Sequence, residues 1–285
     1  MLYSQNYGEF LYAPNTKVVV AHDNHETKPF NYKSQSLLYG YSLIDILLSE
    51  SEIKLNSQNN QFLFNRIFTS NPDSDATRLI GSIAEILVTK FCNEYQEVNR
   101  RLGMHGRHAR NLSDCIDDYI AIATGSQQTR QHYPIYYNPN DTQRDIIWIH
   151  KKKTEHQLLC VGATPSCGKP AGIQVKTSHN YNYVLSSIKK YHYPVLYFDL
   201  SNDWHQLYYS LDKKDYLSML IPHDDITNEI KRFLTGYFSL LVPIFRGEKS
   251  LNYLIDMSKY EGYVDILKGL ELANDDSSKK ILIAK

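Results

Sequence analysis

The chain has 285 residues, 42% of them hydrophobic and 22% charged, a composition that is typical of a globular protein and excludes an intrinsically disordered chain. Lysine plus arginine equals aspartate plus glutamate, at 31 each, so the formal net charge is zero. This balance gives no support to a broad basic surface, and any contact with nucleic acid must use local basic patches.

The cysteine content favours a reducing compartment. The four cysteines form no CxxC pair, and so few in a chain of this length argue against a disulfide framework. The N-terminal residues lack the basic start and the apolar run of a signal peptide, and no stretch is long enough to cross a membrane. We therefore expect a cytoplasmic protein with no membrane partner.

In chain order, residues 1–70 form an accessory region of mixed structure. A strand is expected at Lys17–Ala21 and a helix at Gln35–Ser49, and the polar run Ser49–Gln61 is typical of a loop. A long helix over about Asp75–Tyr95 follows, because capping residues begin it and apolar residues recur within it at helical spacing.

The middle of the chain is rich in predicted strands. A short helical patch at Asp114–Ala123 comes first. Aliphatic and β-branched runs then predict strands at Asp145–His150, Gln157–Ala163 and Gly172–Ser178. The residues from Gly162 to Gly172 form the turn between the last two strands.

A strand–helix–strand step follows. The spacing predicts a helix over Tyr183–Tyr191, a fully buried strand at Pro194–Leu200 and a hairpin partner at His205–Leu211. The step implies a right-handed crossover and a mixed α/β sheet. Residues 71–211 then form the core, and residues 212–285 form a C-terminal region that is mostly helical.

The glycine-rich segment before the third strand does not fit a phosphate-binding loop. That motif needs four residues between its glycines and a serine or threonine after the lysine. Here five residues separate Gly162 from Gly168, and Pro170 follows Lys169. A strand, not a helix, comes next.

The strand Gly172–Ser178 carries the residues that indicate chemistry. Because side chains alternate along a strand, Gln174 and Lys176 share one face, and Asp145 opens the preceding predicted strand. A carboxylate, an amide acceptor and a lysine can together hold a divalent cation and activate water against a phosphodiester. Two simpler interpretations stay open: Asp145 as a turn residue, and Lys176 as an edge-strand lysine that discourages aggregation.

This order of elements resembles the PD-(D/E)xK nuclease superfamily, the fold of many restriction endonucleases and repair nucleases. Glu85 lies on a helix, Asp145 opens a strand, and Gln174-Val175-Lys176 lie on the next strand, with a helix and a buried strand behind them. The resemblance covers about Asp75–Leu211. It implies an α/β protein with a restriction-endonuclease-like mixed sheet flanked by helices, to which the N-terminal and C-terminal regions are additions.

The resemblance also implies a role for each matching residue. Asp145 and the carbonyl of Val175 would ligate Mg²⁺ or Mn²⁺, Lys176 would position the attacking water, and Glu85 would reach the ion directly or through water. Gln174 stands where the family usually has an acid, which removes one negative charge, although an amide oxygen can still ligate a hard cation.

Two basic segments are candidate contacts to a nucleic-acid backbone. One precedes the helical patch and the other follows the strand that begins at Asp145. For the arginine segment a solvated loop is slightly favoured, because no aromatic residue interleaves with the basic ones, and for the lysines a charged hairpin tip is an equally good explanation. The residues are Arg100, Arg101, Arg107, Arg110, Lys151 and Lys152.

Two functions follow as hypotheses. The first is a Mg²⁺-dependent endonuclease that hydrolyses phosphodiester bonds, in DNA in preference to RNA, and a restriction or defence role fits a nuclease of this size. The second is a non-catalytic nucleic-acid-binding or assembly module on the same fold, which the zero net charge and the missing acid at Gln174 favour. The flanking regions would supply substrate choice, a homodimer contact or a surface for a partner protein.

Overall fold

The computed structural model describes residues 2–4, 8–10, 43–56, 61–141, 143–152, 157–162, 168–213 and 216–254. The strand expected at Lys17–Ala21 lies outside these residues, as does the first part of the helix expected at Gln35–Ser49, of which residues 43–49 are helical. The chain forms two compact units. The first unit combines Met1–Ala76 with Gly236–Lys285, and the second is Thr77–Thr235.

The first unit contains two antiparallel strand pairs, β1 (Leu2–Ser4) with β2 (Gly8–Phe10) and β3 (Ile53–Asn56) with β4 (Gln61–Phe64). A short 3₁₀ segment, η4 (Leu251–Leu254), also belongs to it. The prediction of a loop over Ser49–Gln61 was wrong, because β3 lies within that run. Ile53 and Phe62 are buried on facing strands, and their burial outweighs the polar residues around them.

Two long helices cross the boundaries between the units. Helix α2 spans Pro72–Glu94, which confirms the helix predicted over about Asp75–Tyr95. Helix α7 spans Asp225–Phe245 and confirms the helical character expected after residue 212 as far as the described residues extend. The periodic apolar side chains of α2 are buried: Leu79, Ile80, Ile83, Leu87 and Phe91.

The second unit is built around four strands. β5 (Tyr119–Ala123) pairs antiparallel with β6 (Ile146–His150), and β7 (Gln174–Ser178) pairs parallel with β8 (Val195–Asp199). Antiparallel hydrogen bonds between Ile146 and Ile173 link β6 to the start of β7. β5–β6 and β7–β8 are therefore two two-stranded sheets joined by this bridge, and the protein is a mixed α/β protein with small sheets.

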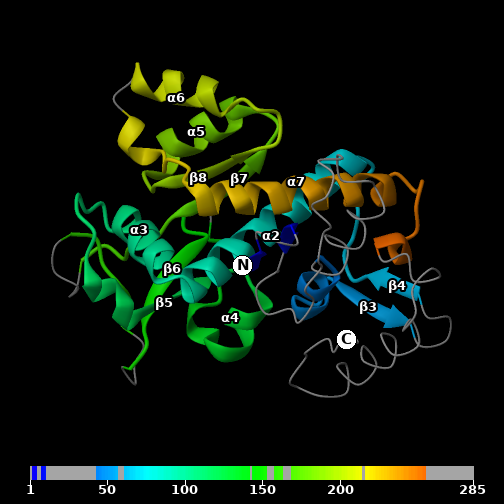
Figure 1. Ribbon diagram of the computed structural model, residues 1–285, viewed down its shortest axis with the longest axis horizontal. Coiled ribbons are helices and arrows are strands. Elements are labelled where there is room, and N and C mark those ends of the chain that lie inside the picture. The colour runs from blue at the N-terminus through cyan, green and yellow to red at the C-terminus, as the bar shows by residue number, and fades with distance from the viewer. Residues whose placement is uncertain are drawn as a thin grey trace. The chain divides into compact units, whose positions relative to one another are not determined.

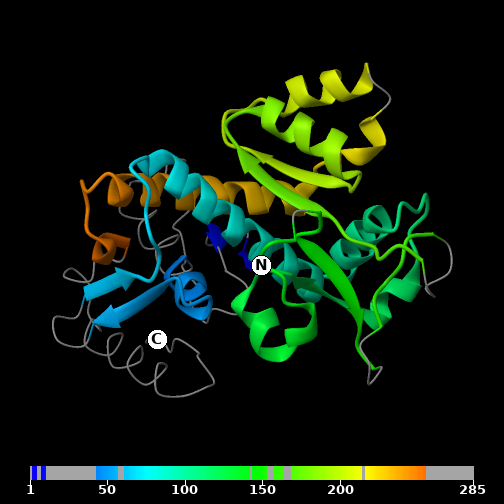
Figure 2. The same ribbon diagram turned by 180° about the vertical axis from the view of Figure 1, so that it is seen from behind.

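The crossover from β7 to β8 runs through α5 (Tyr181–Tyr191), as predicted. The strand expected at His205–Leu211 was wrong: this segment is helix α6 (Trp204–Asp212). Its apolar residues, Trp204, Leu207, Tyr208 and Leu211, have the spacing of one helical face, which the tyrosines obscured. Both helices lie on the same side of β7 and β8 (Figures 1 and 2) and pack with Val195 and Tyr197 into one core.

Shorter elements complete the second unit: α3 (Gln96–Gly106), η1 (Asp114–Asp118), α4 (Gln127–His132), η2 (Pro134–Tyr136) and η3 (Leu217–Met219). The helical patch predicted at Asp114–Ala123 is only partly right, because η1 ends at Asp118 and β5 begins at once. The strand expected at Gln157–Ala163 is reduced to isolated bridges, in which Leu158 pairs with Ile149 and Cys160 with Pro170.

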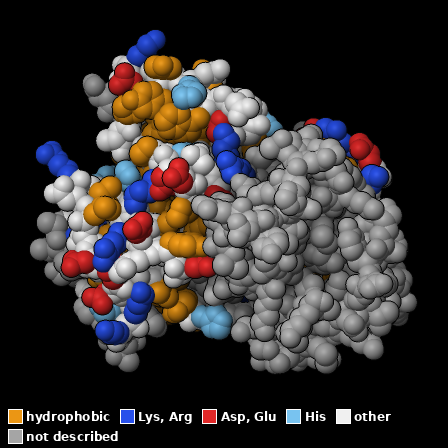
Figure 3. All heavy atoms as spheres, viewed as in Figure 1, with side chains coloured by type: hydrophobic (Ala, Val, Ile, Leu, Met, Phe, Trp, Pro, Cys, Tyr) orange, Lys and Arg blue, Asp and Glu red, His pale blue; other side chains and the backbone are white. Residues whose placement is uncertain are grey.

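Surface charge is mixed. In the described part of the face that Figure 3 shows, lysine and arginine side chains alternate with aspartate and glutamate. Among the described residues, no helix combines the length and the apolar character that a membrane crossing requires.

Candidate metal-dependent active site

The structure brings Asp145 and Lys176 into direct contact. Oδ2 of Asp145 accepts a hydrogen bond from the backbone N–H of Val175 at 2.8 Å and another from Nζ of Lys176 at 2.9 Å. The side chains of Asp145 and Lys176 are 11% and 17% exposed. Because both side chains are largely shielded from water, the attraction between the two charges is screened little. The charge-assisted hydrogen bond then fixes the position of the ammonium relative to the carboxylate.

The backbone explains why the carboxylate lies there. β6 and β7 are hydrogen-bonded at Ile146 and Ile173, and Asp145 immediately precedes this bridge. Gln174 donates its N–H to Pro194, on the β8 side, so the N–H and C=O of Val175 point toward the β6 side. The carboxylate of Asp145 therefore accepts the bond that a strand carbonyl would otherwise accept.

This orientation supplies two oxygen types that a hard cation prefers. The carboxylate of Asp145 contacts the backbone of Val175 on the side of β7 to which the Val175 carbonyl also points, and Gln174, the residue before, is fully buried. Within the described ranges, no three His, Cys, Asp or Glu side chains gather closely enough to hold a metal ion. A cation here would thus have few carboxylate ligands and would depend on carbonyl and amide oxygens.

Glu85 is half-buried on α2. It lies one helical turn after Gly81, where an added Cβ would be 3.4 Å from Oγ1 of Thr177 on β7. The same hydroxyl lies 3.5 Å from the carbonyl oxygen of Thr77, one turn earlier on α2. This stripe of α2, which Glu85 continues, therefore packs on β7 at Thr177, whose side chain lies on the face opposite Gln174 and Lys176.

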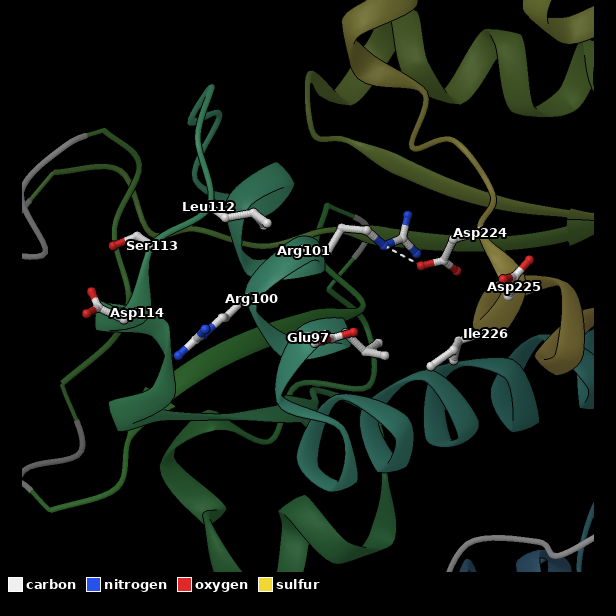
Figure 4. Close-up of a pocket in the computed structure, with 10 residues that line it drawn as sticks. Glu97, Arg100, Arg101, Leu112, Ser113, Asp114, Asp224, Asp225 and Ile226 are labelled. Carbon is white, nitrogen blue, oxygen red and sulfur yellow. Dashed lines mark ion pairs between the residues drawn. The ribbon is translucent and has the colours of Figure 1, made fainter. Parts of the chain in front are cut away.

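Two of the predicted nucleic-acid contacts are engaged in ion pairs. Arg100 pairs with Asp117, and this hydrogen bond lowers the pKa of Asp117. Arg101 pairs with Asp224, with Nε 2.7 Å from the carboxylate oxygen. Both arginines line a cavity of about 500 Å³ between α3 and the start of α7, where Arg101 points toward Asp224 (Figure 4). The positive charges of Arg100 and Arg101 are therefore balanced by neighbouring aspartates.

The other predicted contacts divide into two groups. Arg107 is buried, and its guanidinium donates to Sγ of Cys115 and to the carbonyl of Gly162, so it is used within the protein. The ammonium of Lys151 donates to the carbonyl of Asp117. Arg110 and Lys152 are exposed and remain available to a ligand.

Sequence reasoning missed a second feature beside Asp145. A polar pocket of about 360 Å³, here called the Arg144 pocket, is lined by Asn138, Asn140, Asp141, Gln143, Arg144 and Tyr193, among others. The available signal was the position of Arg144 directly before the candidate catalytic aspartate, three residues after an acid that can hold it. Comparison of the chain with protein-family models, with curated proteins and with solved structures finds no match.

Proposed function

We propose that the protein is a metal-dependent nuclease that hydrolyses phosphodiester bonds, with DNA the preferred substrate. One observation carries the proposal: residues from two adjacent strands converge, so that one carboxylate oxygen of Asp145 contacts both Lys176 and the backbone of Val175. The chain order of α2, β6, β7, α5 and β8 supports it, because these are the elements on which the resemblance was based, although α3, β5 and α4 lie between α2 and β6.

Each group then has a chemical task. Asp145, the carbonyl of Val175 and the amide of Gln174 would hold Mg²⁺ or Mn²⁺. Glu85 is a further candidate ligand on the strength of the family resemblance alone. When bound, the cation would lower the pKa of a water and stabilise negative charge on the phosphate. Lys176 would provide an ammonium for that charge and for orienting the water, and Asp145 holds this ammonium in place.

The alternative to catalysis is a structural ion pair, and the chain offers a matched example. Lys231 Nζ lies 2.6 Å from Oδ1 of Asp199, and these side chains are 26% and 2% exposed. This pair joins α7 to the end of β8 in the same unit. It has the same residue types as the Asp145–Lys176 pair but lies at another position. A variant that breaks this second pair therefore shows what the loss of an ion pair alone does to activity.

The experiment is cleavage of plasmid, linear duplex, single-stranded DNA and RNA in Mg²⁺ or Mn²⁺. It compares wild type with Lys176→Met, Asp145→Asn and the control Lys231→Met. We expect metal-dependent cleavage by wild type and Lys231→Met. We expect a loss of about 10²-fold or more in the other two variants, the scale of an acid–base or charge-stabilising group. Thermal unfolding verifies that each variant is folded.

Two results contradict the proposal. Cleavage that survives both Asp145→Asn and Lys176→Met shows that the site is not responsible. Wild-type protein that neither cleaves nucleic acid nor binds the metal by calorimetry refutes catalysis. In that case the non-catalytic binding or assembly module stands, which the glutamine at position 174 in place of an acid already favours.

A further inference from the structure

We propose that the Arg144 pocket binds a phosphate group of the nucleic-acid strand, next to the phosphate that reaches Asp145. This inference rests on the proposed nuclease function and names a substrate subsite for it. The pocket has an open volume of about 360 Å³ and is lined by polar side chains, among them three amides, Asn138, Asn140 and Gln143. Amide and guanidinium N–H groups are ordinary partners of phosphate oxygens.

The loop that forms the pocket is held by its own hydrogen bonds. Oδ1 of Asp141 accepts from the backbone N–H of Gln143 at 2.9 Å and of Arg144 at 3.2 Å. The backbone N–H of Asp141 donates to the carbonyl of Asn138, and the N–H of Asn138 donates to the carbonyl of Thr124 beside β5. These hydrogen bonds hold the described residues that line the pocket, which lowers the entropic cost of binding a ligand there.

Arg144 is held in place while part of its guanidinium stays unused. Its stem packs on Gly172, where an added Cβ would lie 2.8 Å from Cγ and 2.9 Å from Cδ of the arginine. Nη2 donates to Oδ2 of Asp141 at 3.2 Å, whereas Nη1 has no hydrogen-bond partner among the described residues. Nη1 is buried, but the side chain as a whole is 23% exposed, and this exposed part of Arg144 is what a ligand in the pocket would meet.

A second cation lies against a residue of the pocket wall. Nζ of Lys169, which does not itself line the pocket, is 4.1 Å from the ring centroid of Tyr193, which does. Around Tyr193, Arg144 and Lys169 therefore carry two positive charges and Asp141 carries one negative charge. The excess favours an anionic ligand, and the guanidinium offers the fork geometry that suits phosphate.

Position links this pocket to the proposed active site. Arg144 and Asp145 are consecutive, and consecutive Cα atoms are about 3.8 Å apart. The Arg144 pocket therefore adjoins the proposed active site in the chain, so a strand whose phosphate reaches Asp145 and Lys176 would pass close to Arg144.

The test measures binding of a fluorescent DNA duplex in EDTA, so that no cleavage occurs, over a series of KCl concentrations. It compares wild type with Arg144→Gln, Lys169→Gln and Lys190→Gln. Lys190 is the matched control, because its ammonium also lies over a tyrosine ring, at 4.8 Å from the centroid of Tyr191 on α5. Each variant is first shown to melt like wild type.

We expect Arg144→Gln and Lys169→Gln each to weaken binding by roughly tenfold and to reduce the slope of log K against log salt by about one, the signature of one lost phosphate contact. Lys190→Gln should match wild type. Equal salt slopes in all four proteins overturn the subsite. A loss of affinity in Lys190→Gln as large as in the other two variants also overturns it, because it would show that binding depends on the net charge of the protein and not on this pocket. Single-stranded DNA, RNA and inorganic phosphate are parallel arms that identify the source of the phosphate.

The subsite and the nuclease proposal fail in different ways. If Asp145→Asn abolishes cleavage but Arg144→Gln binds like wild type, the nuclease stands and the subsite is wrong. If the salt slopes change as expected but wild type shows no metal-dependent cleavage, the subsite stands and the nuclease is wrong. If wild type binds no nucleic acid, the subsite is refuted whatever the cleavage assay shows.

Discussion

The side chain of Asn99 joins three elements of the second unit, and its removal should be costly. Asn99, on α3, is buried and accepts a hydrogen bond from Nε1 of Trp148 on β6 at 2.7 Å. Its amide donates to the carbonyls of Ile116 at 3.3 Å and Tyr119 at 3.1 Å. We predict that Asn99→Ala lowers the free energy of unfolding of this unit substantially.

The magnitude follows from what the substitution leaves unpaired. The indole N–H of Trp148, whose side chain is fully buried, loses its acceptor, at a cost of about 1–3 kcal/mol. Two further hydrogen bonds are lost, at about 0.5–1.5 kcal/mol each. The expected total is about 4 kcal/mol. Asn93→Ala is the comparison: Asn93 is exposed and exchanges two bonds with the backbone of Ala121, so a loss of about 1–3 kcal/mol is expected, without the orphaned indole N–H.

Urea unfolding followed by tryptophan fluorescence is the assay, because both tryptophans of the chain, Trp148 and Trp204, belong to the second unit. A double-mutant cycle with Trp148→Phe isolates the indole contact, and we expect a coupling of about 1–2 kcal/mol. The reasoning is refuted if Asn99→Ala costs no more than Asn93→Ala, or if the cycle shows no coupling.

Three further predictions concern α2 and α3. Burial, and to a lesser degree the charge of Arg101, lower the pKa of His105 from its ordinary value of 6.5 to about 4. Between pH 6.5 and about pH 4, the unfolded chain therefore binds a proton at His105 that the folded protein does not bind. Stability should fall as pH drops through this window, and His105→Gln should flatten the fall in urea midpoints; an unchanged slope contradicts the assignment. Gly103→Ala should destabilise by about 1–3 kcal/mol, because its Cβ would lie 2.8 Å from Cγ2 of Ile116, and the double variant with Ile116→Ala should recover part of the loss in the same assay. Burial raises the pKa of the Cys92 thiol far above its ordinary value, so this thiol should react with a disulfide reagent only in urea, and labelling of Cys92 in the native protein would show otherwise.

The elements that were predicted correctly are those in which the buried residues recur at one regular spacing along the sequence. α2 and α5 follow from apolar residues at helical spacing, and β8 follows from a short run that is buried on both faces. α6 was mistaken for a strand because Tyr208 and Tyr209 suit strands by composition, whereas the face that contains Trp204, Leu207 and Leu211 is helical. In α6, packing of this face against β8 outweighs the intrinsic preference of the tyrosines for strands.

The candidate site was predictable in its residues but not in its bonds. Alternation in β7 placed Gln174 and Lys176 on one face, and the structure joins Lys176 to Asp145. The bond from the N–H of Val175 to the carboxylate depends on where β6 and β7 stop pairing, which no local pattern specifies. Likewise, Arg101 resembles a free basic residue in the sequence, because its partner Asp224 is more than a hundred positions away.

The first unit is assembled from the two ends of the chain, and this has a consequence for how the protein is made. Its contacts span long stretches of sequence: Arg246 pairs with Asp73 across 173 positions, and the ring of Phe245 stacks on Phe64. During synthesis, Thr77–Thr235 has all its own residues available before the C-terminal partner segment has left the ribosome. Closing so long a loop is slow, so we expect the second unit to gain hydrogen-exchange protection first during refolding. Simultaneous protection of both units would show that the chain folds as one.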